Sequence, residues 1–285
     1  MAGFHRSDFC RCAAKIRQTR APFWRGQAVS GTRWHDFMPR LVSALVMAAL
    51  AAGCLWAGGV WFMALIALSS GVMIWELGRM CDADRGNALI GTGIAAAAVM
   101  AIVAYAPAFY IAPLLLGFVI ATTLKFRQNQ MIYAGYGALI MLAGYGFIKL
   151  RFDLEPVWML WLILIVVASD VAGYLAGRLL GGPKFWPRLS PKKTWSGTIA
   201  GWLGAGIVGV FFVQSFSFVL ISMLVAFAAQ MGDIAESAIK RHAGIKDSSN
   251  LIPGHGGFMD RFDGMLGAML LVLLLVLFTD FPPMG

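Results

Sequence analysis

Charged side chains are scarce in this sequence. Asp, Glu, Lys and Arg make up only 13% of the 285 residues, whereas 59% of the residues are hydrophobic and the mean hydropathy is +0.74. So apolar a composition excludes a soluble globular domain and is typical of a polytopic membrane protein. The informative count is therefore the number of apolar runs of about 20 residues, the length that an α-helix needs to cross a bilayer.

Cysteine is also scarce, with four residues in the whole chain. Cys54 lies in an apolar run, and the other three lie in polar segments with no partner pattern, which excludes a disulfide framework. Cys10 and Cys12 form a close pair, but no further Cys or His at zinc-site spacing accompanies them. We interpret all four as free thiols.

Apolar runs dominate the rest of the sequence. They indicate an all-α polytopic membrane protein with about nine transmembrane helices. The runs are 41–57, 59–75, 88–105, 107–124, 131–148, 157–175, 197–214, 216–232 and 263–279. Glycines spaced four apart, Gly173 with Gly177 and Gly197 with Gly201, predict close helix packing in the later runs.

The distribution of positive charge predicts the orientation. With nine spans and a cytoplasmic N-terminus, every Lys and Arg except Lys149 and Arg151 falls on the cytoplasmic side. The positive-inside rule therefore predicts a cytoplasmic N-terminus and a C-terminus on the opposite side. The net charge of +9 is then mainly a topology signal, and it does not indicate nucleic-acid binding.

This pattern divides the chain into three regions. Residues 1–40 form a basic cytoplasmic tail, which has no apolar core of a secretory signal peptide before Leu41. The tail suits adsorption to anionic headgroups, or serves as a disordered segment that only fixes orientation; a transit peptide is a third interpretation. Residues 41–150 carry almost no polar chemistry and are predicted to be a supporting bundle. Residues 151–285 are predicted to be a transmembrane catalytic region with cytoplasmic polar loops.

One polar stretch, residues 233–263, stands between two long apolar runs. Its charge density cannot sit in lipid, and a simple connector between membrane helices does not need it. Carboxylates alternate with cations there, and a Gly-Gly turn follows His255, a mixture that suits a metal-complexed polyphosphate. The charged residues are Asp233, Glu236, Lys240, Arg241, Lys246, Asp247, Asp260, Arg261 and Asp263.

This stretch resembles the signature of the phosphatidate cytidylyltransferases, or CDP-diacylglycerol synthases. That signature reads Ser-x-apolar-Lys-Arg, four residues, Lys-Asp, then His-Gly-Gly-apolar-x-Asp-Arg-apolar-Asp. A match at so many positions is far more specific than a lone glycine-rich loop. The residues in register are Ser237, Ile239, Lys240, Arg241, Lys246, Asp247, Ile252, Pro253, His255, Gly256, Gly257, Phe258, Asp260, Arg261, Phe262 and Asp263.

Two shorter segments are similar to other motifs of the same family. Asp170 begins an Asp-x-x-x-Tyr-x-x-Gly-Arg segment, with Ala-Gly-Tyr in place of the usual Gly-Ala-Tyr; alternatively, Asp170 simply pairs with Arg178. The segment from Ser190 to Gly197 resembles Ser-Pro-x-Lys-Thr-x-x-Gly, with Ser196 where Glu or Gln is usual. Its lysines would bind a triphosphate beside the start of a helix; alternatively, they only set the orientation in the membrane by the positive-inside rule.

The resemblance, with helical spacing, implies a site. If the helix of run 216–232 continues to residue 243, Asp233 shares a face with Glu236 and Lys240, while Asp260 and Asp263 lie one turn apart. We therefore expect Asp233, Asp260 and Asp263 to hold Mg²⁺. Alternatively, Asp260 or Asp263 pairs with Arg261 or Lys240 and only anchors the loop. The predicted catalytic residues are Asp233, Lys240, Arg241, Asp260, Arg261 and Asp263. The predicted substrate-binding residues are Asp170, Ser190, Lys192, Lys193, Thr194, Ser237, Lys246, Asp247, His255, Gly256 and Gly257.

The activity implied by the resemblance is transfer of the cytidylyl group of CTP to phosphatidate, which gives CDP-diacylglycerol and pyrophosphate. A CTP-dependent lipid kinase of the polyprenol or phytol type is the alternative enzyme. A transporter or scaffold is disfavoured, because the ionisable residues cluster at one face of the membrane and not along a path through it. The resemblance also implies a bacterial-type inner membrane location with the site facing the cytoplasm, lipid contacts, a possible homodimer and no nucleic-acid partner.

Overall fold

A computed structural model describes residues 37–82, 88–187, 189–252, 256–279 and 281–282. The chain divides into two units, Met1–Met38 and Pro39–Gly285. Only Phe37 and Met38 of the first unit are described, and they begin the first described helix. The predictions for the tail, Cys10 and Cys12 lie outside the described residues. Apart from these two residues, the helices, the strands and the candidate site all belong to the second unit.

The described residues form nine α-helices, and each predicted apolar run is confirmed as helical. The helices are α2 (Phe37–Ala57), α3 (Gly59–Cys81), α4 (Ala88–Val103), α5 (Ala108–Thr123), α6 (Gln130–Phe152), α7 (Pro156–Leu179), α8 (Trp195–Phe212), α9 (Phe216–His242) and α10 (Met259–Phe278). The all-α class is thereby confirmed.

Six of these helices, α3 and α6 to α10, have the length and apolarity needed to cross a membrane. The other three contribute shorter apolar segments, Leu41–Ala57, Leu89–Val103 and Ala108–Thr123. The protein is therefore a multi-pass membrane protein by its helices. A full set of nine spans, and the side on which each end lies, stay predictions.

A short hairpin interrupts the connection between α7 and α8. Strand β1 (Lys184–Trp186) pairs antiparallel with β2 (Ser190–Thr194), with Lys184 opposite Thr194 and Trp186 opposite Ser190. The side chain of Thr194 then caps α8 by accepting the N–H of Gly197 at 3.2 Å. The hairpin thus fixes Lys192 and Lys193 directly before a helix start.

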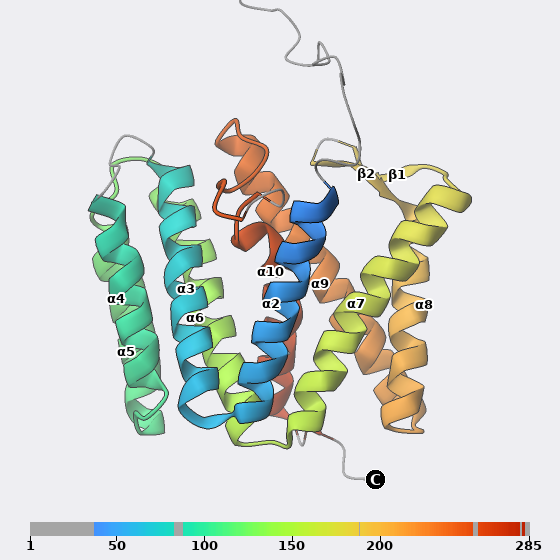
Figure 1. The fold of residues 1–285 in the computed structure, drawn as a ribbon, viewed down its shortest axis with the longest axis horizontal. Helices are drawn as coiled ribbons and strands as arrows, with labels where there is room; N and C mark the ends of the chain where they lie inside the picture. Colours follow the sequence, from blue (N-terminus) through green and yellow to red (C-terminus); the bar gives the residue numbers. More distant parts are fainter. Residues whose placement is uncertain (1–36, 83–87, 188, 253–255, 280, 283–285) are drawn as a thin grey trace, which may run out of the picture. The chain divides into compact units, whose positions relative to one another are not determined.

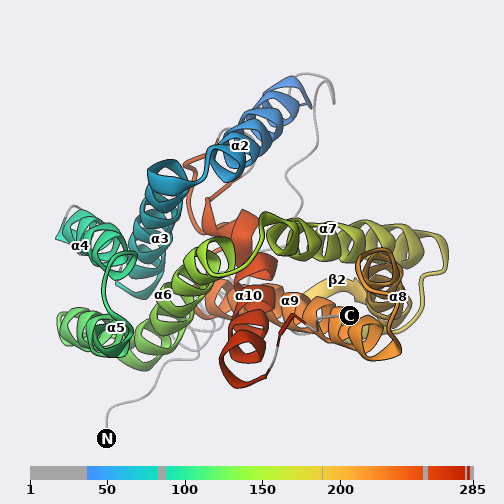
Figure 2. The ribbon, with the colours of Figure 1, turned by 90° about the horizontal axis from the view of Figure 1, so that it is seen from below.

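Helices α9 and α10 lie side by side between α6 and the pair formed by α7 and α8 (Figure 2). The hairpin and the connection from α9 to α10 lie at the same end of the helices, whereas the α6–α7 connection lies at the other end (Figure 1). All the polar segments that flank the later helices therefore meet at one end.

Glycines let the helices of the later half approach closely. A Cβ on Gly232 of α9 would collide with the backbone of Asp263 on α10, so neither helix could keep its place with a larger residue there. A Cβ on Gly197 of α8 would lie 2.5 Å from the carbonyl oxygen of Gly173 on α7. The predicted packing role of Gly173 and Gly197 is confirmed, and the contact at Gly232 places the polar end of α9 directly against the start of α10.

Both described cysteines are free, Cys54 being half-buried and Cys81 buried. For these two residues the interpretation as free thiols is confirmed.

Candidate active site

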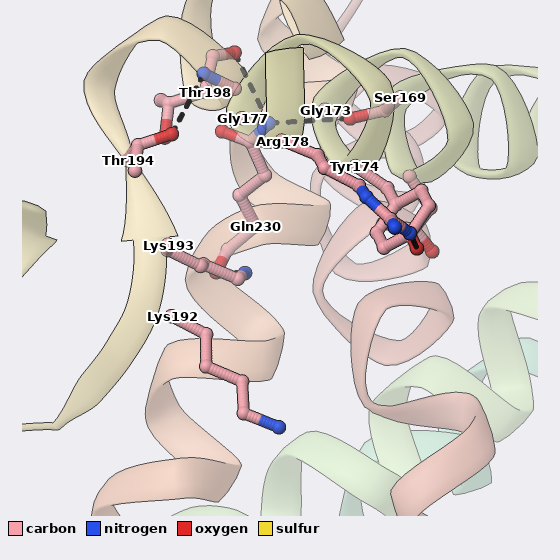
Figure 3. A pocket seen from close by; sticks show the side chains of 12 residues that line it. Ser169, Gly173, Tyr174, Gly177, Arg178, Lys192, Lys193, Thr194, Thr198 and Gln230 are labelled. Carbon is pink, nitrogen blue, oxygen red and sulfur yellow. Dashed lines mark hydrogen bonds between the residues drawn. The ribbon is translucent and has the colours of Figure 1, made fainter. Parts of the chain in front are cut away.

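Two cavities meet at the polar end of the helices. The first, about 390 Å³, is polar and is lined by carboxylates and cations of α9, α10 and β2. The second, about 380 Å³, lies between α7, α8 and β2 and is lined largely by apolar surface (Figure 3). Asp170, Lys193 and Gln230 line both cavities. A polar ligand in one cavity and an apolar ligand in the other would therefore meet at these three residues.

Three carboxylates converge at the wall of the polar cavity. One oxygen each of Asp233, Glu236 and Asp263 lies within 4.8 Å of the others. Glu236 is fully buried, and its Oε1 has no hydrogen-bond partner. Leaving a buried carboxylate oxygen unpaired is costly, and a divalent cation would satisfy it. The donor set consists only of carboxylate oxygens, which suits Mg²⁺.

Asp260 has a different environment from Asp263, although the two residues are one helical turn apart. Its carboxylate accepts from Lys240 Nζ at 2.7 Å, from the N–H of Ser248 at 3.0 Å and from the N–H of Gly257 at 2.9 Å. It also lines the polar cavity. The role of Asp260 as a metal ligand stays a prediction, and in this structure the residue fastens the α9–α10 connection.

Lys240 bridges two buried carboxylates. Its Nζ lies 2.6 Å from Glu236 Oε2 and 2.7 Å from Asp260 Oδ1, and its side chain is 12% exposed. The ammonium therefore offsets part of the negative charge of the carboxylates that α9 and α10 bring together. It pairs with Oε2 of Glu236 and leaves Oε1 without a partner.

Lys193 stands between the two cavities. Its Nζ pairs with Asp233 Oδ2 at 2.5 Å and lies 3.5 Å from the carbonyl oxygen of Gln230. Lys192 is exposed and lines the apolar cavity (Figure 3). The structure thus brings both predicted lysines to the site, with Lys193 directly beside the carboxylate cluster.

Gln230 forms the wall between the cavities, and no pattern in the sequence singles it out. Its Nε2 donates to Ser169 Oγ and to the carbonyl oxygen of Thr198, both at 3.3 Å (Figure 3). Its Oε1 accepts from Trp202 Nε1 at 2.9 Å. Because every polar atom of the amide is engaged, this wall is fixed by α7 and α8 together.

The alternative pairing of Asp170 with Arg178 is not found among the described ion pairs. Arg178 Nη1 instead donates to the hydroxyl of Tyr174 at 2.7 Å, at the margin of the apolar cavity (Figure 3). Asp170 is exposed to both cavities.

The remaining predicted residues divide into four groups. Asp247 and Arg261 line the polar cavity, and Ser237 Oγ donates to Asp233 Oδ1 at 3.4 Å. Exposed positions outside the two cavities are held by Arg241, whose Nη1 donates to the carbonyl oxygen of Ile245, and by Lys246. Ser190 lies in β2, outside both cavities. His255 lies outside the described residues.

The two predicted glycines have structural reasons to be glycine. Gly256 has φ of 85°, a conformation that residues with a Cβ rarely adopt. Gly257 has no space for a Cβ, which would collide with Ser248 Oγ and lie 2.8 Å from Glu76 Oε1. Substrate contacts of either glycine stay a prediction.

Glu76 of α3 is the site-adjacent residue that sequence reasoning missed most completely. It is fully buried and bonds to the residues that flank the Gly-Gly turn. An acid at the end of an otherwise apolar run was the available signal, because an ionisable residue inside a membrane helix is functional by default.

Comparison with known proteins shows the family of the chain. Residues 38–279 match the model described as the cytidylyltransferase family, which covers most of the chain. The chain belongs to the cytidylyltransferase family. The resemblance noted in the polar stretch is therefore confirmed, and the matched range contains both cavities.

Similar curated proteins carry one name. A protein of Brucella suis biovar 1 is 32% identical over 266 residues, which cover 84% of this chain and 93% of that protein. A protein of Rickettsia bellii is 42% identical over 123 residues, 38% of this chain and 53% of its own length. A protein of Helicobacter pylori is 40% identical over 151 residues, 50% of this chain and 54% of its own. All three are named phosphatidate cytidylyltransferase.

Proposed function

We propose that this protein is a phosphatidate cytidylyltransferase, which transfers the cytidylyl group of CTP to phosphatidate. The observation that carries the proposal is the junction of two cavities of opposite character. Charged residues of α9 and α10 line one, apolar surface of α7 and α8 lines the other, and Asp170, Lys193 and Gln230 belong to both. A nucleoside triphosphate suits the charged cavity, and the acyl chains of a lipid phosphate suit the apolar one.

The residues of the carboxylate cluster would hold the metal ion. Asp233, Glu236 and Asp263 fit Mg²⁺ by donor type and by the unpaired buried oxygen of Glu236. When bound, the ion supplies charge neutralisation for the nucleotide phosphates. Glu236 thus joins Asp233 and Asp263 as a proposed metal ligand. Asp260, in the first turn of α10, remains a further candidate ligand.

The cations of the polar cavity would take the phosphates. Lys193, Lys240 and Arg261 line it and would neutralise the triphosphate and the departing pyrophosphate. An oxygen of the phosphatidate phosphate attacks the α-phosphorus of CTP, and the bond from that phosphorus to the oxygen bridging to the β-phosphate breaks. The phosphatidate phosphate has a second pKa of about 6 and is largely dianionic at neutral pH, so no general base is required. The protein contributes positioning and charge neutralisation.

The apolar cavity would hold the lipid. Gly173, Gly177 and Gly197 line this cavity where α7 and α8 pack closely, and Tyr174, Arg178 and Lys192 line the same cavity. Acyl chains would lie along the apolar surface while the phosphate reaches the junction at Lys193.

Product analysis tests the function. Purified protein in nanodiscs, supplied with phosphatidate, a polyprenol, Mg²⁺ and CTP labelled at the α-phosphorus, is expected to release pyrophosphate and to place the label in lipid. A lipid kinase acting on a polyprenol would instead release labelled CDP and leave the lipid unlabelled. Formation of labelled CDP without labelled lipid would contradict the proposal.

We further propose a cytoplasmic site in an inner membrane. The hairpin, which holds Lys192 and Lys193, and the end of α9 that holds Lys240 lie at one end of the helices. The end of α6 that holds Lys149 and Arg151 lies at the other (Figure 1). Reporter fusions after residues 85 and 190 are expected to report cytoplasm, and a fusion after residue 285 the opposite side. A cytoplasmic signal from the last fusion would contradict the nine-span topology.

The lysines of the hairpin are expected to bind CTP, Lys193 from the polar cavity and Lys192 from the adjoining apolar cavity. Replacing Lys192 and Lys193 together by Ala should raise KM for CTP about tenfold or more, since a hydrogen bond to a charged group contributes about 1.5–3 kcal/mol. The matched control is the exposed pair Lys125 and Arg127 in the α5–α6 connection, outside both cavities. Equal CTP saturation in the two double variants would mean that the hairpin lysines serve orientation only.

A further inference from the structure

Glu76 is a buried acid in the part of the chain predicted only to support the catalytic region. It lies in α3, is 0% exposed, and contacts a segment more than 170 positions later in the sequence. A carboxylate is rarely buried so completely unless its oxygens are paired. Its partners therefore indicate what it does.

Each of the two carboxylate oxygens of Glu76 accepts two hydrogen bonds. Oε1 accepts from Ser249 Oγ at 2.5 Å and from the N–H of Phe258 at 2.8 Å. Oε2 accepts from Ser248 Oγ at 3.2 Å and from the N–H of Met259 at 2.6 Å. One side chain of α3 thus ties together the two sides of the α9–α10 connection.

The two backbone donors are at the start of α10. The first N–H groups of a helix have no partner within it, and Phe258 provides no side-chain cap of its own. The carboxylate of Glu76 takes that role from another helix, and its negative charge is favourable at this end of the α10 dipole.

The same loop residues also bond to the candidate site. The N–H of Ser248 donates to Asp260 at 3.0 Å while its hydroxyl donates to Glu76. The N–H of Gly257 donates to Asp260 at 2.9 Å, and a Cβ on Gly257 would collide with Ser248 Oγ and lie 2.8 Å from Glu76 Oε1. Glu76 and Asp260 therefore both hold the loop by hydrogen bonds.

We propose that Glu76 is a positioning residue for the cytidylyl transfer proposed above. By fixing the first turn of α10 it sets where Asp260 and Asp263 face Asp233 and Glu236, and so governs the affinity of the carboxylate cluster for a divalent cation. The kinetic consequences rest on the proposed function, whereas the effects on the loop and on cation binding do not depend on it.

Glu76→Gln is the informative change because it is nearly isosteric. The two serine hydroxyls can rotate to accept, but the N–H groups of Phe258 and Met259 cannot, so the amide NH₂ must face one of them. Ser248→Ala is the milder companion, which removes one donor and leaves its backbone bond to Asp260. The control is Ser70→Ala, since Ser70 is buried in the same helix and its hydroxyl has no hydrogen-bond partner.

Three measurements on the full chain in nanodiscs test the proposal. Mn²⁺ binding without nucleotide is expected to weaken about tenfold in Glu76→Gln, the ratio that corresponds to one lost buried hydrogen bond of about 1.4 kcal/mol. Amide hydrogen exchange in residues 256–262 should accelerate by a similar factor. The magnesium concentration for half-maximal activity should rise, kcat should fall, and KM for phosphatidate should not change, because the lipid cavity does not include Glu76.

The outcomes separate the possible failures. Normal Mn²⁺ affinity and normal exchange in Glu76→Gln would overturn the positioning role. A rise of KM for phosphatidate in parallel with the loss of Mn²⁺ affinity, or equal effects in Ser70→Ala, would also overturn it, since both indicate general destabilisation. If Glu76→Gln cannot be isolated folded, Ser248→Ala must show the same changes in Mn²⁺ affinity, hydrogen exchange and kinetics, each of smaller magnitude. If Ser248→Ala shows none of these changes, the proposal is overturned. A wild-type protein that binds Mn²⁺ through this cluster but transfers no cytidylyl group would contradict the proposed function alone.

Discussion

Replacing Asp263 by asparagine is expected to abolish cytidylyl transfer at ordinary magnesium concentrations. Asn keeps the size and polarity of Asp263 but removes the charge that a divalent cation needs, in a cluster where Asp233 and Glu236 supply the other oxygens. The loss should be about a thousandfold or more, at the upper end of the cost of removing one preorganised electrostatic contact. Mn²⁺ binding without nucleotide should be lost in parallel.

Asp260→Asn is expected to abolish turnover as well, and the structure adds a second reason. The carboxylate of Asp260 holds Lys240 and two loop N–H groups, so its neutralisation loosens the connection that precedes Asp263. The control is Asp153→Asn, which removes an exposed acid at the end of α6 that pairs with Lys149. Should both site variants retain near-normal transfer and an unchanged magnesium dependence, the metal would have to lie elsewhere, with Asp170 and Asp247 the next candidates.

The helices could be predicted because each is specified locally. An apolar run of bilayer length predicts a helix without knowledge of any other segment, and all nine runs are helical. The β1–β2 hairpin could not be predicted this way, since Ser-Pro-Lys-Lys-Thr is polar and has no strand alternation. Its pairing depends on the position of the α8 start, where Thr194 forms the cap.

The carboxylates show where helical spacing stops being informative. Three-residue spacing places Asp260 and Asp263 on one face, yet loop N–H groups hold Asp260 while Asp263 faces α9. Glu236 shares a face with Asp233, but only the packing of α9 on α10 shows that it is buried there. The role of Glu76 was the hardest to predict, because its hydrogen-bond partners become its neighbours only when α3 packs near the start of α10.

The wall between the cavities explains how substrates of unlike polarity can react in one site. Gln230 is held by Ser169 of α7 and Trp202 of α8, while Lys193 from β2 reaches past it to Asp233. A lipid phosphate at this junction would exchange contacts with Lys193 without entering the carboxylate cluster itself. Repulsion between the anionic lipid and Asp233 is thereby limited by the cation placed between them.

Removing Lys240 is expected to cost more stability than any other single charge deletion in the site. Its ammonium bridges Glu236, whose side chain is 0% exposed, and Asp260, whose side chain is 8% exposed. Lys240→Met preserves much of the length of the side chain but leaves both buried carboxylates without their cation. Breaking a buried pair in this way costs about 3–5 kcal/mol, so the free energy of unfolding should fall by that order and transfer should be lost.

Thermal unfolding with and without Mg²⁺ measures this effect and separates it from general damage. A cation that binds only the folded cluster stabilises by mass action, so Mg²⁺ should recover part of the loss in Lys240→Met, whereas Asp263→Asn should gain nothing from it. The control is Lys125→Met, an exposed lysine outside both cavities. A Lys240→Met protein that unfolds at the same temperature as Lys125→Met would show that solvent, and not Lys240, compensates the charge of Glu236 and Asp260.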